Sequence, residues 1–281
     1  MKAMFIKWRN STAGKLSVIL IAASILLCLF AGLVLKDHCI GEKLANFISN
    51  IFIGIGTNLC GIVVTISFVQ YFIDKQSEKD DREKERKQIL RHNMYMDVLI
   101  DKYFSMYLSV TSRFNDRFVD VEISKVPERN IKFSDLADMY QMSFIIGEGL
   151  LEPAIKGYYT AERTLRECML RMIESIDFQY FPQIDELLQE FVRISKEEDV
   201  SGELINNLNI KSGVKSHSEI CAKNIADDEE HDWVGKYERG ELGNNIMLPY
   251  VIFYLQIQKE CKLLTEYKKS ISEISDRRTE A

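Results

Sequence analysis

The sequence contains little of what enzyme chemistry usually needs. It has four histidines in 281 residues and none of the motifs GxGxxG, GxxxxGK[ST], HExxH, GxSxG or paired CxxC, which mark nucleotide, nucleophile and metal sites. Only His231 has neighbouring candidate ligands, in the acidic run 227–230 and in Asp232. Such a run is typical of a solvated edge, and no second cluster completes a site. The sequence therefore predicts no enzyme, no metal and no cofactor.

Helix-breaking residues are also scarce. The chain has four prolines, and neither proline nor glycine occurs from Ile62 to Val126, so nothing there forces a helix to end. Residues 74–88 read DKQSEKDDREKERKQ, with acids placed four residues before bases, an order that supports an exposed helix. We expect a long charged stalk helix, which either transmits a signal or is simply a solvated linker.

Two long stretches of the otherwise charged chain lack any charge. Residues 16–35 and 47–73 contain no Asp, Glu, Lys or Arg. About 20 apolar residues in a helix match a hydrocarbon core of about 30 Å, and a longer segment can tilt. Both stretches are longer than the apolar region of about 7 to 15 residues that is usual in a cleaved signal peptide. The sequence therefore predicts two transmembrane helices.

Lysine and arginine near these stretches predict their orientation, because basic residues favour the cytoplasmic side. Four precede the first stretch, six follow the second within residues 74–87, and the link between the stretches has two. Both termini should therefore be cytoplasmic. The predicted organisation is a cytoplasmic segment 1–15, transmembrane helices 16–36 and 47–73, a periplasmic loop 37–46, and a cytosolic α-helical domain 74–281 entered by the stalk.

The predicted cytosolic part is acidic. Residues 1–73 carry six Lys/Arg and two Asp/Glu, and the remainder carries 30 and 40, a net charge of −10. Nonspecific nucleic-acid binding depends mainly on cationic contacts to phosphates. We therefore expect no direct nonspecific nucleic-acid binding. A chain of this length past residue 73 can bury a core of its own, most simply as one domain.

The six cysteines predict no disulfide framework. Cys28 and Cys60 lie in the apolar stretches, and three others lie in the part assigned to the reducing cytosol. Only Cys39 falls in the predicted outside loop. It is either an unpaired loop thiol or the site of an intermolecular bridge between two copies.

Four segments after the stalk carry apolar residues at helical spacing. They are Tyr95, Leu99, Tyr103, Met106 and Val110; Tyr158, Ala161, Leu165, Cys168, Met172 and Ile176; Ile184, Leu187, Leu188, Phe191 and Val192; and Tyr250, Phe253, Ile257, Cys261, Leu264, Tyr267, Ile271 and Ile274. Each pattern is typical of one buried helix face. Pro153 and Pro182 mark helix starts, residues 142–147 are a candidate strand, and residues 195–245 read as loops with short helices. The sequence predicts an all-α fold, with the stalk and the last helix, from about Leu248, as neighbours.

The second apolar stretch has a polar face. With about 100° per residue, six positions fall within an arc of about 100°. This polar stripe consists of Asn50, Gly54, Thr57, Asn58, Gly61 and Thr65. Asn58 lies near the middle of the stretch, where an amide without a partner costs several kcal/mol in hydrocarbon.

The first stretch offers small residues that allow close helix approach. They are Ser17, Ser24, Cys28 and Ala31, with Gly32 at the margin. Two interpretations of the polar stripe stay open. In the first, membrane packing, the stripe packs against the small residues of the first stretch within one chain. In the second, a polar path, the stripe faces other protomers and on activation lines a polar path or a membrane defect.

The layout resembles a known class of proteins. A two-helix N-terminal unit with GIGTNLCGIVVTISF in its second helix is followed by DKQSEKDDREKERK and an acidic helical body. This resembles the two-transmembrane effectors of bacterial anti-phage systems, especially the retron-associated type, over about a third of the chain. The resemblance implies antiviral defence at the bacterial inner membrane, a toxin held silent until infection, and a reverse transcriptase with its RNA–DNA product as partners.

Two functions are therefore compatible with the sequence. The first is an inner-membrane effector, a homo-oligomer in the lipid bilayer, that perturbs or permeabilises the membrane when its cytosolic helical domain is released or activated. The alternative is a membrane-anchored scaffold or signalling partner without pore activity, in which the two helices only anchor the chain. The polar stripe, joined to an unbroken stalk, favours the first.

Overall fold

A computed structural model describes residues 12–36, 42–115, 126, 129–144, 151–212 and 215–276. Cys39 lies outside the described residues. Helices make up nearly all of the regular structure described, and the strands found there are only two or three residues long. The prediction of an all-α fold is confirmed.

The chain divides into two compact units, Met1–Glu83 and Lys84–Ala281. Helix α3 (Glu42–Val110) begins in the first unit and ends in the second, so the second apolar stretch and the charged segment form one helix, as predicted. Residues 42–46, which the sequence assigned to the loop, are helical. Residues 42–46 contain neither proline nor glycine, so nothing there prevents the helix from beginning before the apolar stretch.

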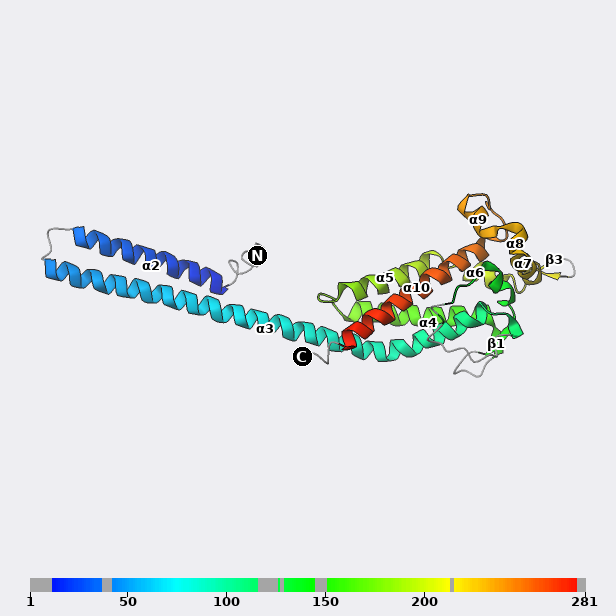
Figure 1. Ribbon diagram of the computed structural model, residues 1–281, viewed down its shortest axis with the longest axis horizontal. Helices are drawn as coiled ribbons and strands as arrows, with labels where there is room; N and C mark the ends of the chain where they lie inside the picture. The colour runs from blue at the N-terminus through cyan, green and yellow to red at the C-terminus, as the bar shows by residue number, and fades with distance from the viewer. Residues whose placement is uncertain are drawn as a thin grey trace. The chain divides into compact units, whose positions relative to one another are not determined.

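In the first unit, α2 (Thr12–Lys36) runs beside the N-terminal part of α3 (Figure 1). Among the described residues, these are the two helices long and apolar enough to cross a membrane, and most side chains in their apolar windows are exposed. Leu26, Leu33 and Val64 are each about two-thirds exposed, at 66%, 66% and 68%. Large apolar side chains that stay uncovered over so wide a surface mark a face made for a partner or a membrane.

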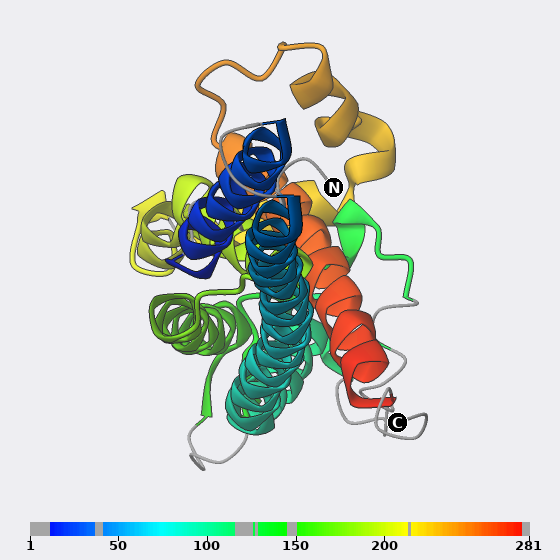
Figure 2. The same ribbon diagram turned by 90° about the vertical axis from the view of Figure 1, so that its left-hand side faces the viewer.

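In the second unit, the C-terminal part of α3 packs with α4 (Ala154–Ser175), α5 (Pro182–Glu197) and α10 (Leu248–Asp276) around one apolar core. We call this unit the helical domain. Helix α10, orange to red, lies beside α3 in both views (Figures 1 and 2). Tyr267 and Lys268 of α10 bind Asn93 and Asp101 of α3, at 3.0 and 2.8 Å.

The periodic apolar positions are largely buried, as predicted. All eight named in α10 have exposed fractions below 9%. Tyr95 is an error, because it is 59% exposed and Met96, at 0%, occupies the core instead. The other four positions named in α3, Leu99, Tyr103, Met106 and Val110, are buried as predicted, and toward the start of the domain the buried face continues through Met96 and Ile89.

Short elements cover the rest of the helical domain. They are η3 (Phe133–Asp138), β1 (Met142–Phe144), β2 (Leu151–Pro153), α6 (Ser201–Asn206), β3 (Lys211–Ser212), β4 (Lys215–Ser216), α7 (His217–Ala226), α8 (Asp228–His231) and α9 (Trp233–Glu238). β1 pairs antiparallel with β2, and β3 with β4. The candidate strand is thus confirmed over 142–144, and residues 195–245 hold short helices as predicted.

Candidate functional site

Helices α2 and α3 are in close contact at Gly56. The Ser24 hydroxyl donates a hydrogen bond to the Gly56 carbonyl oxygen at 2.8 Å and lies 3.1 Å from the Cys60 Sγ. A Cβ at position 56 would lie 2.9 Å from the Cys28 Sγ, closer than a carbon and a sulfur can pack. A side chain at position 56 would therefore force Cys28 or the helices to shift, as is usual where small residues bring helices together.

The polar stripe does not make this contact. Ser17, Ser24 and Ala31 of α2 are buried, which agrees with the small-residue face expected on that helix. The α3 residues buried in the first unit are Ala45, Ser49, Gly56 and Val63. In this structure α2 therefore packs on the face of α3 that carries Ala45, Ser49, Gly56 and Val63, and not on the polar stripe.

The polar stripe lies on the uncovered side of α3 in the first unit. Asn50, Thr57, Asn58, Gly61 and Thr65 are exposed and Gly54 is half-buried. A Cβ at Gly54 or Gly61 would meet nothing within 4 Å. The structure thus brings the six residues to one face of the helix and leaves that face without a partner among the described residues of the first unit.

The stripe's hydroxyls and amides differ in their hydrogen bonding. Thr57 donates to the carbonyl oxygens of Ile53 and Gly54, both at 3.0 Å, and Thr65 donates to that of Gly61 at 3.0 Å. Within the described part of the chain, neither the Asn50 nor the Asn58 side chain has a hydrogen-bond partner. Threonines can satisfy themselves on their own helix, whereas asparagines there need a partner from outside it.

The Gly56 contact leads to a matched pair of substitutions. Gly56→Leu should separate α2 from α3, because its side chain meets Cys28 and the Ser24 backbone, whereas Gly32→Leu enters open space. In a Ser24→Cys and Cys28→Ser background, the cysteine at position 24 can crosslink with the native Cys60, because these two side chains lie 3.1 Å apart in the wild type. We expect Gly56→Leu to lower the yield of this crosslink at least fivefold. A yield equal to that of Gly32→Leu would show that the helices do not pack through Gly56.

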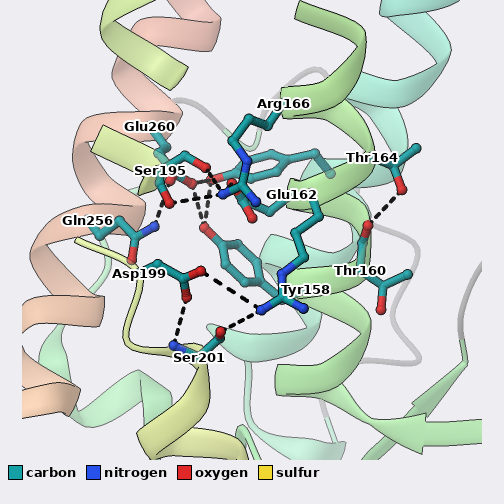
Figure 3. A network of polar contacts seen from close by, with 12 residues as sticks. Tyr158, Thr160, Glu162, Thr164, Arg166, Ser195, Asp199, Ser201, Gln256 and Glu260 are labelled. Atoms are coloured by element: carbon teal, nitrogen blue, oxygen red, sulfur yellow. Dashed lines mark hydrogen bonds and ion pairs between the residues drawn. The ribbon is translucent and has the colours of Figure 1, made fainter. Parts of the chain in front are cut away.

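The helical domain contains a second polar assembly, buried between its long helices (Figure 3). Glu260 of α10 is 0% exposed. Its Oε2 accepts hydrogen bonds from the hydroxyls of Tyr103 at 2.8 Å and Tyr158 at 2.6 Å, and its Oε1 accepts one from the Gln256 amide at 2.8 Å. One carboxyl group therefore joins α3, α4 and α10 in the middle of the core.

A second acid, Glu162 of α4, lies close to this group and is 1% exposed. Its Oε1 accepts a hydrogen bond from Arg166 at 3.1 Å, and Arg166 also donates to the Ser195 hydroxyl of α5 at 2.7 Å. Burial, together with the neighbouring Glu260, raises the pKa of Glu162 to about 8. Burial also raises the pKa of Glu260, against the hydrogen bonds it accepts. Near neutral pH the two carboxyls hold at least one proton between them.

Neither the Gly56 contact nor the buried acids were found from the sequence, although both left a signal. Ala45, Ser49, Phe52, Gly56 and Val63 follow one face of α3, a repeat of threes and fours typical of close-packed helices. Glu260 stands at a core position between Ile257 and Leu264. A charged residue in an otherwise apolar face signals a buried polar group.

The acidic run near His231 forms helix α8 and lies beside α9. The His231 ring is 5.0 Å from the Trp233 ring. Among the described residues no group of three or more His, Cys, Asp or Glu side chains is placed to hold a metal ion.

Comparison of the chain with protein-family models, with curated proteins and with solved structures found no match. The features of the described residues that bear on function are the polar stripe of α3, the buried Glu260 cluster and α3 itself, which begins in one unit and ends in the other.

Proposed function

We propose that this protein is an inner-membrane effector that perturbs or permeabilises the bilayer when its helical domain is released or activated. In this proposal α2 and the N-terminal part of α3 span the membrane with both chain termini in the cytoplasm, and the helical domain is cytosolic. The observation that carries the proposal is the polar stripe of α3, which is left uncovered in a helix long enough to span.

The chemistry of the stripe supports self-association. An amide without a partner in hydrocarbon costs several kcal/mol, and Asn58 finds none among the described residues. Copies of α3 that face one another with this stripe satisfy the amides by bonding between chains. A ring of such faces encloses asparagine and threonine side chains without ionisable groups, which suits a nonselective leak better than a proton path.

The partners follow from the resemblance and from charge. A defence role would place a reverse transcriptase and its RNA–DNA product upstream of the effector. Because residues 74–281 carry a net charge of −10, direct contact with the nucleic acid is unfavourable and contact through protein is favoured. Antiviral defence, toxicity and oligomer formation therefore enter as parts of the same proposal.

Induced expression in bacteria, read with a membrane-potential dye, tests the proposal. We expect the wild-type chain to depolarise the membrane once activated, and Asn58→Leu to reduce the depolarisation at least tenfold, because leucine removes the amide from the polar face. Leu59→Ala, on the adjoining face of the same turn, is the control and should retain most of the effect.

The alternative function predicts a different set of results. A scaffold that uses α2 and α3 only as an anchor would give no depolarisation under any activating condition and would keep its function when both apolar segments are exchanged for an unrelated anchor. Depolarisation that is equal in wild type and Asn58→Leu would also contradict a polar path along the stripe.

A further inference from the structure

Glu85 of α3 caps the start of α5. It is 8% exposed, and its carboxylate accepts hydrogen bonds from the backbone N–H groups of Tyr180, at 3.1 and 3.2 Å, and Phe181, at 3.2 Å. Helix α5 begins at Pro182, and its N-cap residue Phe181 makes no side-chain cap of its own. The carboxylate of Glu85 therefore supplies both the acceptor and the negative charge that favour a helix N-terminus.

Arg86, the next residue of α3, contacts the C-terminal end of another helix, α10. The Arg86 Nε donates a hydrogen bond to the Ile274 carbonyl oxygen at 3.0 Å. Ile274 lies in the last turn of α10, which contains no basic residue of its own. The guanidinium thus meets a carbonyl at the negative end of the helix dipole. Consecutive residues of α3 serve two helix ends of opposite polarity.

These contacts, which we call the entry clamp, stand where α3 joins the helical domain. Residues 71–82 of α3 are exposed, and the apolar burial of α3 in this unit begins only at Ile89. The first buried contact of α3 in the domain is therefore charged. Adjacent residues of a helix point about 100° apart, so Glu85 and Arg86 hold α3 from two sides and oppose its rotation as well as its withdrawal.

We propose that the entry clamp is an autoinhibitory contact, and that its opening frees the first turns of α3 in the helical domain. The inference rests on the proposed function, because it names how the silent state is held. Contacts at the rim of a domain open at far lower free energy than the core behind them. A partner that takes over the start of α5 or the last turn of α10 competes directly with α3 and releases it first at the clamp.

Hydrogen exchange on the full-length chain in lipid nanodiscs tests the clamp. Glu85→Ala should speed exchange at the Tyr180 and Phe181 amides at least tenfold and should also expose the α3 amides between residues 85 and 93. Arg86→Ala should expose the same part of α3. Glu78→Ala and Lys79→Ala, one heptad earlier on the exposed stalk, are matched controls and should leave every exchange rate unchanged.

Two further readouts separate opening from unfolding. In the clamp variants, exchange in α4 must stay at the wild-type rate. If Glu85→Ala speeds exchange in α4 and so unfolds the domain, Glu85→Gln is measured in its place. Glutamine keeps one acceptor oxygen without the charge, so it should speed exchange at the clamp by an intermediate amount. Faster exchange at Tyr180 and Phe181 with α3 fully protected would overturn the proposal, because Glu85 would then be only a helix cap.

Depolarisation in cells relates the clamp to the proposed function. Glu85→Ala and Arg86→Ala should depolarise the membrane without a trigger, at least fivefold above wild type. If the triggered wild type depolarises and these variants gain nothing without the trigger, the inhibitory role of the clamp is refuted. If exchange shows α3 released and no form of the chain ever depolarises, the proposed membrane activity fails while the clamp stands as the contact that holds α3.

Discussion

Glu260→Ala is expected to lower the free energy of unfolding of the helical domain by roughly 3 to 5 kcal/mol, because three buried donors lose their acceptor. The substitution leaves the hydroxyls of Tyr103 and Tyr158 without their common acceptor, and both tyrosines are 0% exposed. A buried donor without an acceptor costs about 1 to 3 kcal/mol. The Gln256 amide loses its acceptor as well.

The effect is measured by amide exchange of α4 and α10 in the detergent-solubilised full chain. Glu260→Gln keeps a carbonyl acceptor at nearly the same place, so it should lose less than half as much stability. Glu266→Ala, on an exposed position of the same helix, should change the free energy of unfolding by less than about 0.5 kcal/mol. A Glu260→Ala variant as stable as Glu266→Ala would show that the carboxyl does not hold the three helices together.

The helical domain was largely predictable because its signal is periodic and local. The eight apolar positions named in α10 repeat at threes and fours and are all buried, and Pro182 begins α5 as a proline at the first helical position does. The same spacing cannot tell which helices meet at a given core position. The contacts of Glu260 with α3 and α4 depend on residues 157 and 102 positions away, and no local pattern encodes such pairing.

The first unit shows why residue type alone did not identify the face of α3 that packs against α2. The asparagines and threonines of the polar stripe were predicted to need a helix partner because unpartnered polar groups are costly in lipid. Helix contact there is decided instead by size, since Gly56 is the position at which a side chain does not fit. The continuity of the stalk was easier to predict, because no proline or glycine after Gly61 interrupts α3. Its end at Val110 was not predictable in this way, because proline and glycine stay absent up to Val126.

The stability of the helical domain is also expected to fall as pH rises from about 5 to 8.5. Glu162 has an ordinary pKa of 4.5, and burial beside Glu260 raises it to about 8 in the folded chain. Between these two values the folded state binds more protons than the unfolded state, so the free energy of unfolding decreases with increasing pH. Stability from this group is complete below its unfolded pKa and is lost as pH passes through its folded pKa.

The size of the loss follows from the raised pKa, at about 1.4 kcal/mol for each unit of pKa. Because Glu162 and Glu260 ionise at each other's expense and Arg166 favours the first ionisation, we expect a loss of roughly 2 to 5 kcal/mol over this range.

Glu162→Gln keeps the shape of the side chain but cannot ionise, so it should flatten most of the slope and leave only the part due to Glu260. Glu167→Gln, exposed on the same helix, should follow the wild-type profile. Amide exchange of α4 measured from pH 5 to 8.5, corrected for the intrinsic rate at each pH, gives these profiles. A wild-type profile that is flat or rising, or one shared by Glu162→Gln, would show that the two buried acids do not hold a proton in the folded domain.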